Sequence, residues 1–199
     1  QKTAYEISTR DWSSDVCSSD LSGDPKPDVE KLLFDYRSAW LPHEPDAIQF
    51  GSTETRASLD ALAGKMLTAF LASPAASVHG RVLGVEEEIR GMLVQGVPDL
   101  YGRVDLLTED DNTLTITDVK TSRGKWSQEQ VKDSGEQLLL YSHLASEISP
   151  GKKIATRFLV LTKTREPQIE EHVREVNPAA VKRTLAGVER VWRAIESGN

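Results

Sequence analysis

Two aspartates and a lysine between residues 101 and 120 are the strongest candidates for chemistry in this chain. Asp105 lies in an apolar run and Asp118 in an alternating one, so both stretches are predicted to be β-strands. Residues 109–112 between them are typical of a turn, and a hairpin there would bring the two carboxylates together. Lys120 follows Asp118 by two residues, so alternation places both side chains on one face of the strand.

This combination of side chains points to a divalent cation. Paired carboxylates on a sheet surface repel each other unless a cation lies between them, and oxygen ligands suit Mg²⁺ or Mn²⁺. An ammonium group beside such an ion can stabilise developing charge or help to activate water. The sequence therefore predicts a metal site formed by the two aspartates, with Lys120 next to it.

A helix is predicted directly after this strand. Ser127 and Gln130 have the spacing of a capping box, and the helix is expected to reach about Ser146. Gln137 and Tyr141 are four residues apart and so share one helix face, with three leucines between them for core contacts. The position of this helix in the chain predicts that its polar pair lies over the two carboxylates.

The other elements follow from periodicity and end signals. Two helices come first, one capped by Asp28 and ending before Pro42, the other over residues 52–71. Strands are predicted at residues 82–89, 93–95, 154–163 and 168–176, and a last helix begins at Asn177-Pro178. The order α, α, β-meander, α, β, β, α predicts an α/β fold in which a mixed central sheet is flanked by helices.

The first 21 residues are expected to be an artefactual, non-native leader. Residues 1–7 and 11–21 match the translation of a short-read sequencing adapter, and the gap between them fits an index barcode. We therefore expect residues 22–199 to be one domain that is truncated at its N-terminus. The only cysteine, Cys17, lies in the leader, so the rest has no disulfide and no thiolate metal site.

The charge and hydropathy exclude some classes of protein. Without the two basic and four acidic residues of the leader, the formal charge changes from −7 to −5. This acidity argues against a non-specific coat on nucleic acid, because such binding depends on phosphate neutralisation, but it permits an enzyme with a local basic groove. No apolar run is long enough to span a membrane, and we expect a cytoplasmic protein.

Three motifs, in this order, resemble the RecB-like branch of the PD-(D/E)XK nuclease superfamily. They are Gly-Arg-Val-Asp at residues 102–105, Asp-Val-Lys-Thr-Ser at 118–122, and Gln-Leu-Leu-Leu-Tyr at 137–141. Each motif is weak by itself, whereas the ordered set on strand, strand and helix is specific. The resemblance covers most of residues 22–199 and implies a restriction-endonuclease-like core with the order α-β-β-β-α-β.

The resemblance also implies a reaction, namely metal-assisted hydrolysis of phosphodiester bonds in DNA. Asp105 and Asp118 would bind Mg²⁺ or Mn²⁺ with the backbone carbonyl of Val119. Lys120 would position or activate the attacking water. Gln137 and Tyr141 would contact DNA or the surroundings of the metal.

The family context adds further expectations. Exonuclease action is favoured over endonuclease action, in DNA repair, recombination, or phage or defence DNA processing, with a helicase or recombination protein as partner and no membrane. Relatives often carry an acid on the first strand, which Glu86 matches best, although a solvated strand face is the favoured interpretation of Glu86.

Two features of the family are missing from the sequence. A metal-binding histidine usually lies in a Gly-x-x-x-His context on an early helix, and neither His43 nor His79 has that context. We expect this histidine upstream of Ser22. Some relatives hold an iron–sulfur cluster through cysteines near both ends of the domain, and no such cysteines are visible in residues 22–199.

Simpler interpretations compete with each assignment. Asp105 could cap a turn, and Asp118 and Lys120 could form an exposed ion pair, which would contribute little to stability. Gln137 could be a solvated helix residue and Tyr141 a core aromatic with a wet hydroxyl.

Other residues, and the chain as a whole, also have simpler interpretations. Residues that follow the site could contact phosphate and bases, or equally form an ordinary charged surface: Arg123, Lys125, Trp126 and Lys132. The histidines show no ligand spacing and are predicted to have surface or core roles: His43, His79, His143 and His172. The whole chain could be a catalytically inactive DNA-binding or scaffolding relative. If the two aspartates lay far apart, an unrelated α/β ligand-binding domain would be favoured.

Overall fold

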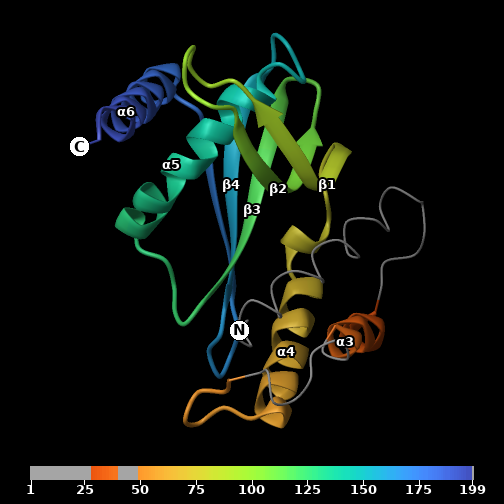
Figure 1. Cartoon of the computed structure of the whole chain (residues 1–199). Helices are drawn as coiled ribbons and strands as arrows, with labels where there is room; N and C mark the ends of the chain where they lie inside the picture. The colour runs from red at the N-terminus through yellow and green to blue at the C-terminus, as the bar shows by residue number, and fades with distance from the viewer. Residues whose placement is uncertain (1–27, 40–48, 199) are drawn as a thin grey trace. The chain divides into compact units, whose positions relative to one another are not determined.

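A computed structural model of the protein describes residues 28–39 and 49–198, so the predicted leader lies outside the described residues. Their helices and strands follow the predicted order (Figure 1). The chain divides into two compact units, which are described separately. The first contains the described residues up to Val78 together with Val119–Lys125 and Leu159–Glu171, and the second contains the rest.

Five strands form one sheet in the order β1-β2-β3-β4-β5. Their bounds are β1 Arg81–Gly91, β2 Leu100–Glu109, β3 Thr113–Ser122, β4 Lys153–Thr162 and β5 Ile169–Glu175. The first three strands form an antiparallel meander. Hydrogen bonds join Lys153 N to the Asn112 carbonyl near the start of β3 and Lys163 N to the Ser122 carbonyl near its end, so β4 runs parallel to β3. The predicted mixed sheet and α/β class are confirmed.

Helix α5 (Gln128–Ala145) provides the crossover that a parallel pair of strands needs. It begins as predicted, because the Ser127 side chain accepts a hydrogen bond from Gln130 N and the Gln130 side chain accepts one from Ser127 N. Its buried side chains include Val131, Leu138 and Tyr141. The helix thereby contributes to the core of the second unit.

The first unit has its own core, built around α3 (Val29–Ser38) and α4 (Arg56–Leu71). Buried side chains of both helices pack with Leu159 and Leu161 of β4. The predicted cap at Asp28 is confirmed. Helix α4 begins four residues later than predicted, because Thr55 and Ser58 form a capping box that fixes its start.

The strand predicted at residues 93–95 is wrong. This segment is a turn that Val97 N closes by donating to the Val94 carbonyl, and Gly96 adopts a φ of 81° in it. The apolar run that suggested a strand reflects burial instead, since Leu93 is 7% exposed within the loop.

Strand β1 is irregular and lies at one edge of the sheet. Its register with β2 shifts between Val82 and Gly84, which indicates a β-bulge. Glu86, two residues later, has a φ of 52°, the only left-handed backbone of a non-glycine residue in residues 28–39 and 49–198. Such a conformation is uncommon for residues with a side chain, so the surrounding structure must hold Glu86 in place.

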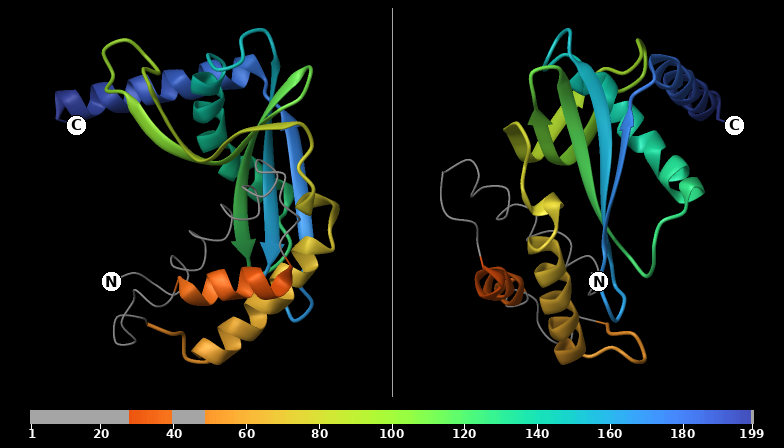
Figure 2. Two further views of the ribbon diagram at one scale, coloured as in Figure 1. Left: turned by 90° about the vertical axis from the view of Figure 1, so that its right-hand side faces the viewer. Right: turned by 180° about the vertical axis from the view of Figure 1, so that it is seen from behind.

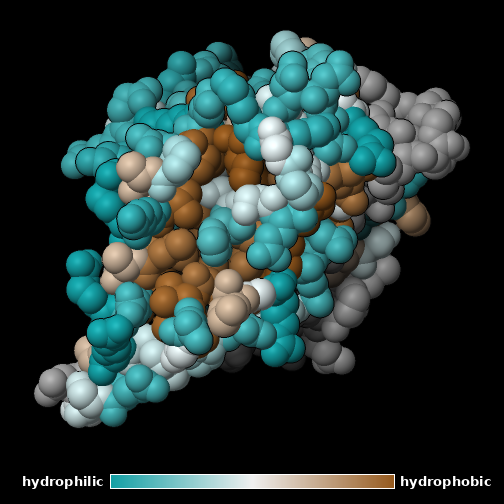
Figure 3. All heavy atoms as spheres, turned by 90° about the horizontal axis from the view of Figure 1, so that it is seen from above, coloured by the Kyte–Doolittle hydropathy of each residue, from teal (hydrophilic) through white to brown (hydrophobic). Residues whose placement is uncertain are grey.

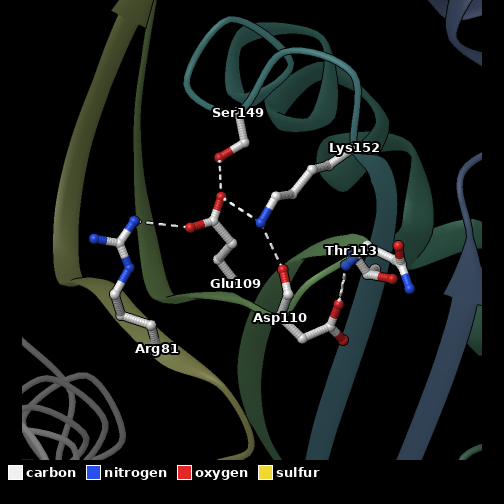
Figure 4. Close-up of polar contacts among 7 residues, drawn as sticks. Arg81, Glu109, Asp110, Thr113, Ser149 and Lys152 are labelled. Atoms are coloured by element: carbon white, nitrogen blue, oxygen red, sulfur yellow. Dashed lines mark hydrogen bonds and ion pairs between the residues drawn. The ribbon is translucent and has the colours of Figure 1, made fainter.

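Glu109, at the end of β2, joins three segments of the second unit (Figure 4). Its carboxylate accepts hydrogen bonds from Arg81 and Ser149 and pairs with the ammonium of Lys152 at 2.9 Å. These three contacts, with that to Arg81 the largest, lower the pKa of Glu109 from 4.5 to about 2. Asp110 orders the adjacent turn by accepting from the backbone N–H groups of Asn112 and Thr113.

We expect Glu109→Gln to lower the melting temperature at neutral pH. Because folding lowers the pKa of this acid, the charged form stabilises the fold above pH 4.5, and the contribution is lost as the pH falls toward about 2. The difference in melting temperature between wild type and variant should therefore shrink over that range. Glu175→Gln is the control, since Glu175 and its partner Lys153 are each 66% exposed. Equal effects of the two substitutions would contradict this role of Glu109.

Helix α6 (Pro178–Ser197) begins at the predicted Asn177 cap, whose side chain accepts from Ala179 N. None of its residues is buried, and Val191 and Ile195 of its apolar stripe are 62% and 60% exposed. Figure 3 shows hydrophobic residues between hydrophilic ones on the face seen from above. Within the described ranges, no helix combines the length and apolar character that crossing a bilayer requires.

Candidate active site

Asp105 and Asp118 lie on neighbouring strands, each one residue beyond the paired segment of β2 and β3. Leu106 of β2 is paired with Thr117 of β3, and Leu107 with Ile116. The same antiparallel register, continued by one residue, would place Asp105 opposite Asp118. Residues opposite each other point to the same face of a sheet, so the two carboxylates share one face.

The burial of this pair makes it electrostatically costly. Asp118 is 8% exposed and its Oδ2 atom is buried, while Asp105 is half-buried. A carboxylate that is removed from water beside a second carboxylate destabilises the fold unless a positive charge compensates. Burial also contradicts the interpretation of Asp118 as part of an exposed ion pair.

The pair fits one divalent ion. Mg²⁺ usually binds through one or two carboxylates, with water and substrate phosphates as its remaining ligands. Within residues 28–39 and 49–198, no group of three or more histidine, cysteine, aspartate or glutamate side chains is arranged to hold a metal. Asp105 and Asp118 can supply two hard oxygen ligands to such an ion.

Glu86 lies on β1, opposite Asp105 of the neighbouring strand β2. Val85 is paired with Leu106 and Glu87 with Val104, so the register places Glu86 opposite Asp105. Its side chain is only 20% exposed and forms an ion pair with Arg103 at 3.1 Å. The favoured interpretation of Glu86 as a solvated residue is therefore wrong.

Val119 and Lys120 follow Asp118 on the same continuous strand, β3. Alternation directs Asp118 and Lys120 to one face of that strand, and both Val119 and Lys120 are half-buried. Their roles as metal ligand and water-activating residue stay predictions.

Tyr141 on α5 contacts β2 at Gly102, and Gln137 contacts Tyr141. A Cβ atom at Gly102 would lie 2.4 Å from Tyr141 Cε1 and 2.9 Å from its hydroxyl oxygen, so only glycine leaves room for this ring. Gln137 Nε2 donates a 2.6 Å hydrogen bond to the Tyr141 hydroxyl, and Tyr141 is 7% exposed. Tyr141 is thus a core aromatic whose hydroxyl orients Gln137.

The placement of this pair relative to the carboxylates is less direct than expected. Gly102 and Asp105 are three residues apart on β2, so alternation directs them to opposite faces of the strand. Tyr141 therefore meets β2 on the Gly102 face. Their contact with DNA or with the surroundings of a metal stays a prediction.

Trp126 packs inside the second unit. Its ring centroid lies 5.1 Å from that of Phe158 on β4 and 6.5 Å from that of His172 on β5, with the His172 ring stacked at 20°. These contacts occupy the ring and favour a structural role over stacking on nucleic-acid bases. His172 also has the structural role expected for it.

Sequence reasoning missed two contacts near the site. Arg103, inside the first motif, forms an ion pair with Glu86. Gly102 contacts the ring of Tyr141, which lies on a helix that begins 26 residues later. The only signals were the glycine itself and an arginine two residues before Asp105. Neither identifies its partner, because the partners lie on other elements.

Comparisons with known proteins agree with this architecture. The crystal structure named "Putative exonuclease" from Eubacterium rectale matches over 90% of this chain and 73% of its own, with a TM-score of 0.52 and 16% identity. That likeness shows a shared fold. The crystal structure of SSO0001 matches over 96% of this chain and 75% of its own, with a TM-score of 0.38 and 15% identity. No curated protein matches the sequence.

A family model decides the family. The model of the PD-(D/E)XK nuclease superfamily matches residues 18–199, which include all three motifs. The resemblance drawn from Gly102 to Tyr141 is thereby confirmed at the level of the superfamily. The chain belongs to the PD-(D/E)XK nuclease superfamily.

Proposed function

We propose that this chain is a RecB-like nuclease domain that hydrolyses phosphodiester bonds in DNA with the help of Mg²⁺ or Mn²⁺. The observation that supports the proposal is the register of β2 and β3, whose continuation by one residue would set Asp105 opposite the buried Asp118 in a member of a nuclease superfamily. Exonuclease action in repair, recombination, or phage or defence DNA processing, alongside a helicase or recombination protein, is part of the proposal.

The residues divide the work as follows. Asp105 and Asp118 would hold the ion with the backbone carbonyl of Val119, and a bound ion would polarise the phosphate and lower the pKa of a water. Lys120 would orient that water and stabilise negative charge on the phosphate. Gln137, held by the Tyr141 hydroxyl, would present its amide toward DNA.

A second candidate is a relative that binds DNA without cleaving it. Calorimetric titration with Mn²⁺ separates the two, because the nuclease requires saturable binding that Asp105→Ala weakens. An inactive relative shows neither saturable Mn²⁺ binding nor an effect of Asp105→Ala on it.

The proposal is tested by cleavage of end-labelled linear DNA and of closed circular DNA with Mg²⁺, with Mn²⁺ and with EDTA. We expect metal-dependent cleavage of the linear DNA, and a loss of roughly 10²- to 10⁴-fold in Lys120→Ala, the range for a residue that moves or orients a proton. Lys153→Ala is the matched control, since this lysine is 66% exposed and pairs with Glu175. Cleavage that persists in EDTA, or that Lys120→Ala leaves intact, would reject the proposal.

A further inference from the structure

Two loops of the first unit carry a concentration of positive charge. We call them the basic loop pair, residues 120–125 (KTSRGK) and 163–168 (KTREPQ). They contain five basic residues and one acid, Glu166, in a chain whose formal charge is −7. Figures 1 and 2 show both loops at the same end of the parallel strands β3 and β4.

Hydrogen bonds fix the two loops to each other and in shape. Lys163 N donates to the Ser122 carbonyl, which ties the second loop to the first. Within the second loop, Thr162 Oγ1 accepts from Gln168 N at 2.8 Å, and Thr164 Oγ1 donates to the Glu166 carbonyl at 2.6 Å. A charged surface that is already ordered loses less conformational entropy when it binds a ligand.

Three of the five basic side chains of these loops are available for a ligand. Arg123, Lys125 and Arg165 are exposed, and no carboxylate in the described part of the chain pairs with any of them. Arg37, by contrast, is neutralised by Asp60. Arg123, Lys125 and Arg165 therefore give the loop pair exposed positive charge in an acidic protein.

We propose that the basic loop pair binds the phosphate backbone of the DNA strand next to the position of cleavage. The inference rests on the proposed function and extends it to residues outside the three motifs. Lys120 begins the first loop, and Arg123 and Lys125 follow it directly along the chain. A strand whose phosphate reaches Lys120 continues with one negative charge per nucleotide, which guanidinium and ammonium groups neutralise.

DNA fits this surface better than an acidic protein does. Guanidinium groups bind phosphate through paired hydrogen bonds that need no apolar contact. The five basic residues of the loops alternate with polar or turn-forming residues, and the loops contain no large apolar side chain. An interface with a protein would need a buried apolar centre, which these two loops do not offer.

The test measures DNA binding as a function of salt. The triple variant R123Q/K125Q/R165Q and the wild type are titrated onto labelled duplex DNA in EDTA, so that binding is read without cleavage. Each lost phosphate contact lowers the slope of log K against log salt by about 0.9, so we expect a slope smaller by roughly 2 to 3 in the variant. The control K182Q/R183Q/R190Q removes three exposed basic residues of α6 and should leave the slope unchanged.

The outcomes separate this inference from the proposed function. An unchanged slope in the loop variant, an equal change in the α6 control, or the absence of measurable DNA binding by the wild type would overturn the inference. Binding of the wild type and of the loop variant to vesicles of anionic lipid is measured alongside. If the three substitutions abolish vesicle binding and leave DNA binding intact, the inference is also overturned. The proposed function fails separately, if the wild type binds DNA yet does not cleave it with Mg²⁺ or Mn²⁺.

Discussion

Asp118→Asn is expected to reduce DNA cleavage by at least about 10³-fold and to remove the stabilisation of the folded protein by Mn²⁺. The loss follows because a bound ion contributes several kcal/mol of charge stabilisation, and each 1.36 kcal/mol is tenfold in rate. An amide of the same shape lacks the negative charge that attracts a divalent ion.

The two effects are measured by a cleavage assay and by thermal denaturation with and without Mn²⁺. Because a ligand that binds only the folded state stabilises it, Mn²⁺ should raise the melting temperature of the wild type and not that of the variant. Asp111→Asn, the same change at an exposed position in the β2–β3 turn, should alter neither property. A variant that cleaves normally, or that Mn²⁺ stabilises as it does the wild type, would show that Asp118 is not a metal ligand.

Gly102→Ala is expected to destabilise the protein by about 1–3 kcal/mol, the usual cost of overpacking a filled core. Its Cβ atom would lie 2.4 Å from a ring carbon of Tyr141, a side chain that is buried and cannot swing into solvent without opening the core. Chemical denaturation measures the loss. Because Tyr141 also holds Gln137, the variant should disturb the amide of Gln137 as well.

Gly135→Ala on α5 is expected to change the stability in the opposite direction to Gly102→Ala. Nothing lies within 4 Å of a Cβ atom at Gly135, so the helix should gain roughly 0.5–1 kcal/mol of stability from the loss of glycine.

In a Tyr141→Ala background the destabilisation caused by Gly102→Ala should largely disappear, since the clashing ring is gone. A Gly102→Ala variant as stable as the wild type would refute the steric role of Tyr141.

Local signals explain why so much of the fold could be predicted. The caps at Asp28, Ser127 and Asn177 act within three residues of themselves, and all three helices begin where these residues indicate. The predicted start of α4 and the strand at residues 93–95 were wrong for different reasons. The capping box of Thr55 and Ser58 starts α4 later than residue 52, and burial of Leu93 in a loop imitated the apolar pattern of a strand.

The candidate site shows the same division between local and distant information. A hairpin of nearly equal arms brings its ends together, so the pairing of β2 with β3 up to Leu106 and Thr117 could be predicted from the turn between them. The position of Glu86 could not, because it depends on the bulge that sets the register of β1. The contact between Gly102 and Tyr141 joins elements far apart in the chain and leaves no periodic signal.

The irregularity of β1 also bears on how the protein behaves at high concentration. Edge strands expose unpaired backbone groups on which another chain can add a strand and begin aggregation, and bulges disfavour such growth. At β1 the shift at Gly84 and the left-handed Glu86 interrupt the flat edge. At the opposite edge, four of the seven residues of β5 are glutamate or arginine. Both ends of the sheet are therefore poor templates for self-assembly, by distortion at one edge and by charge at the other.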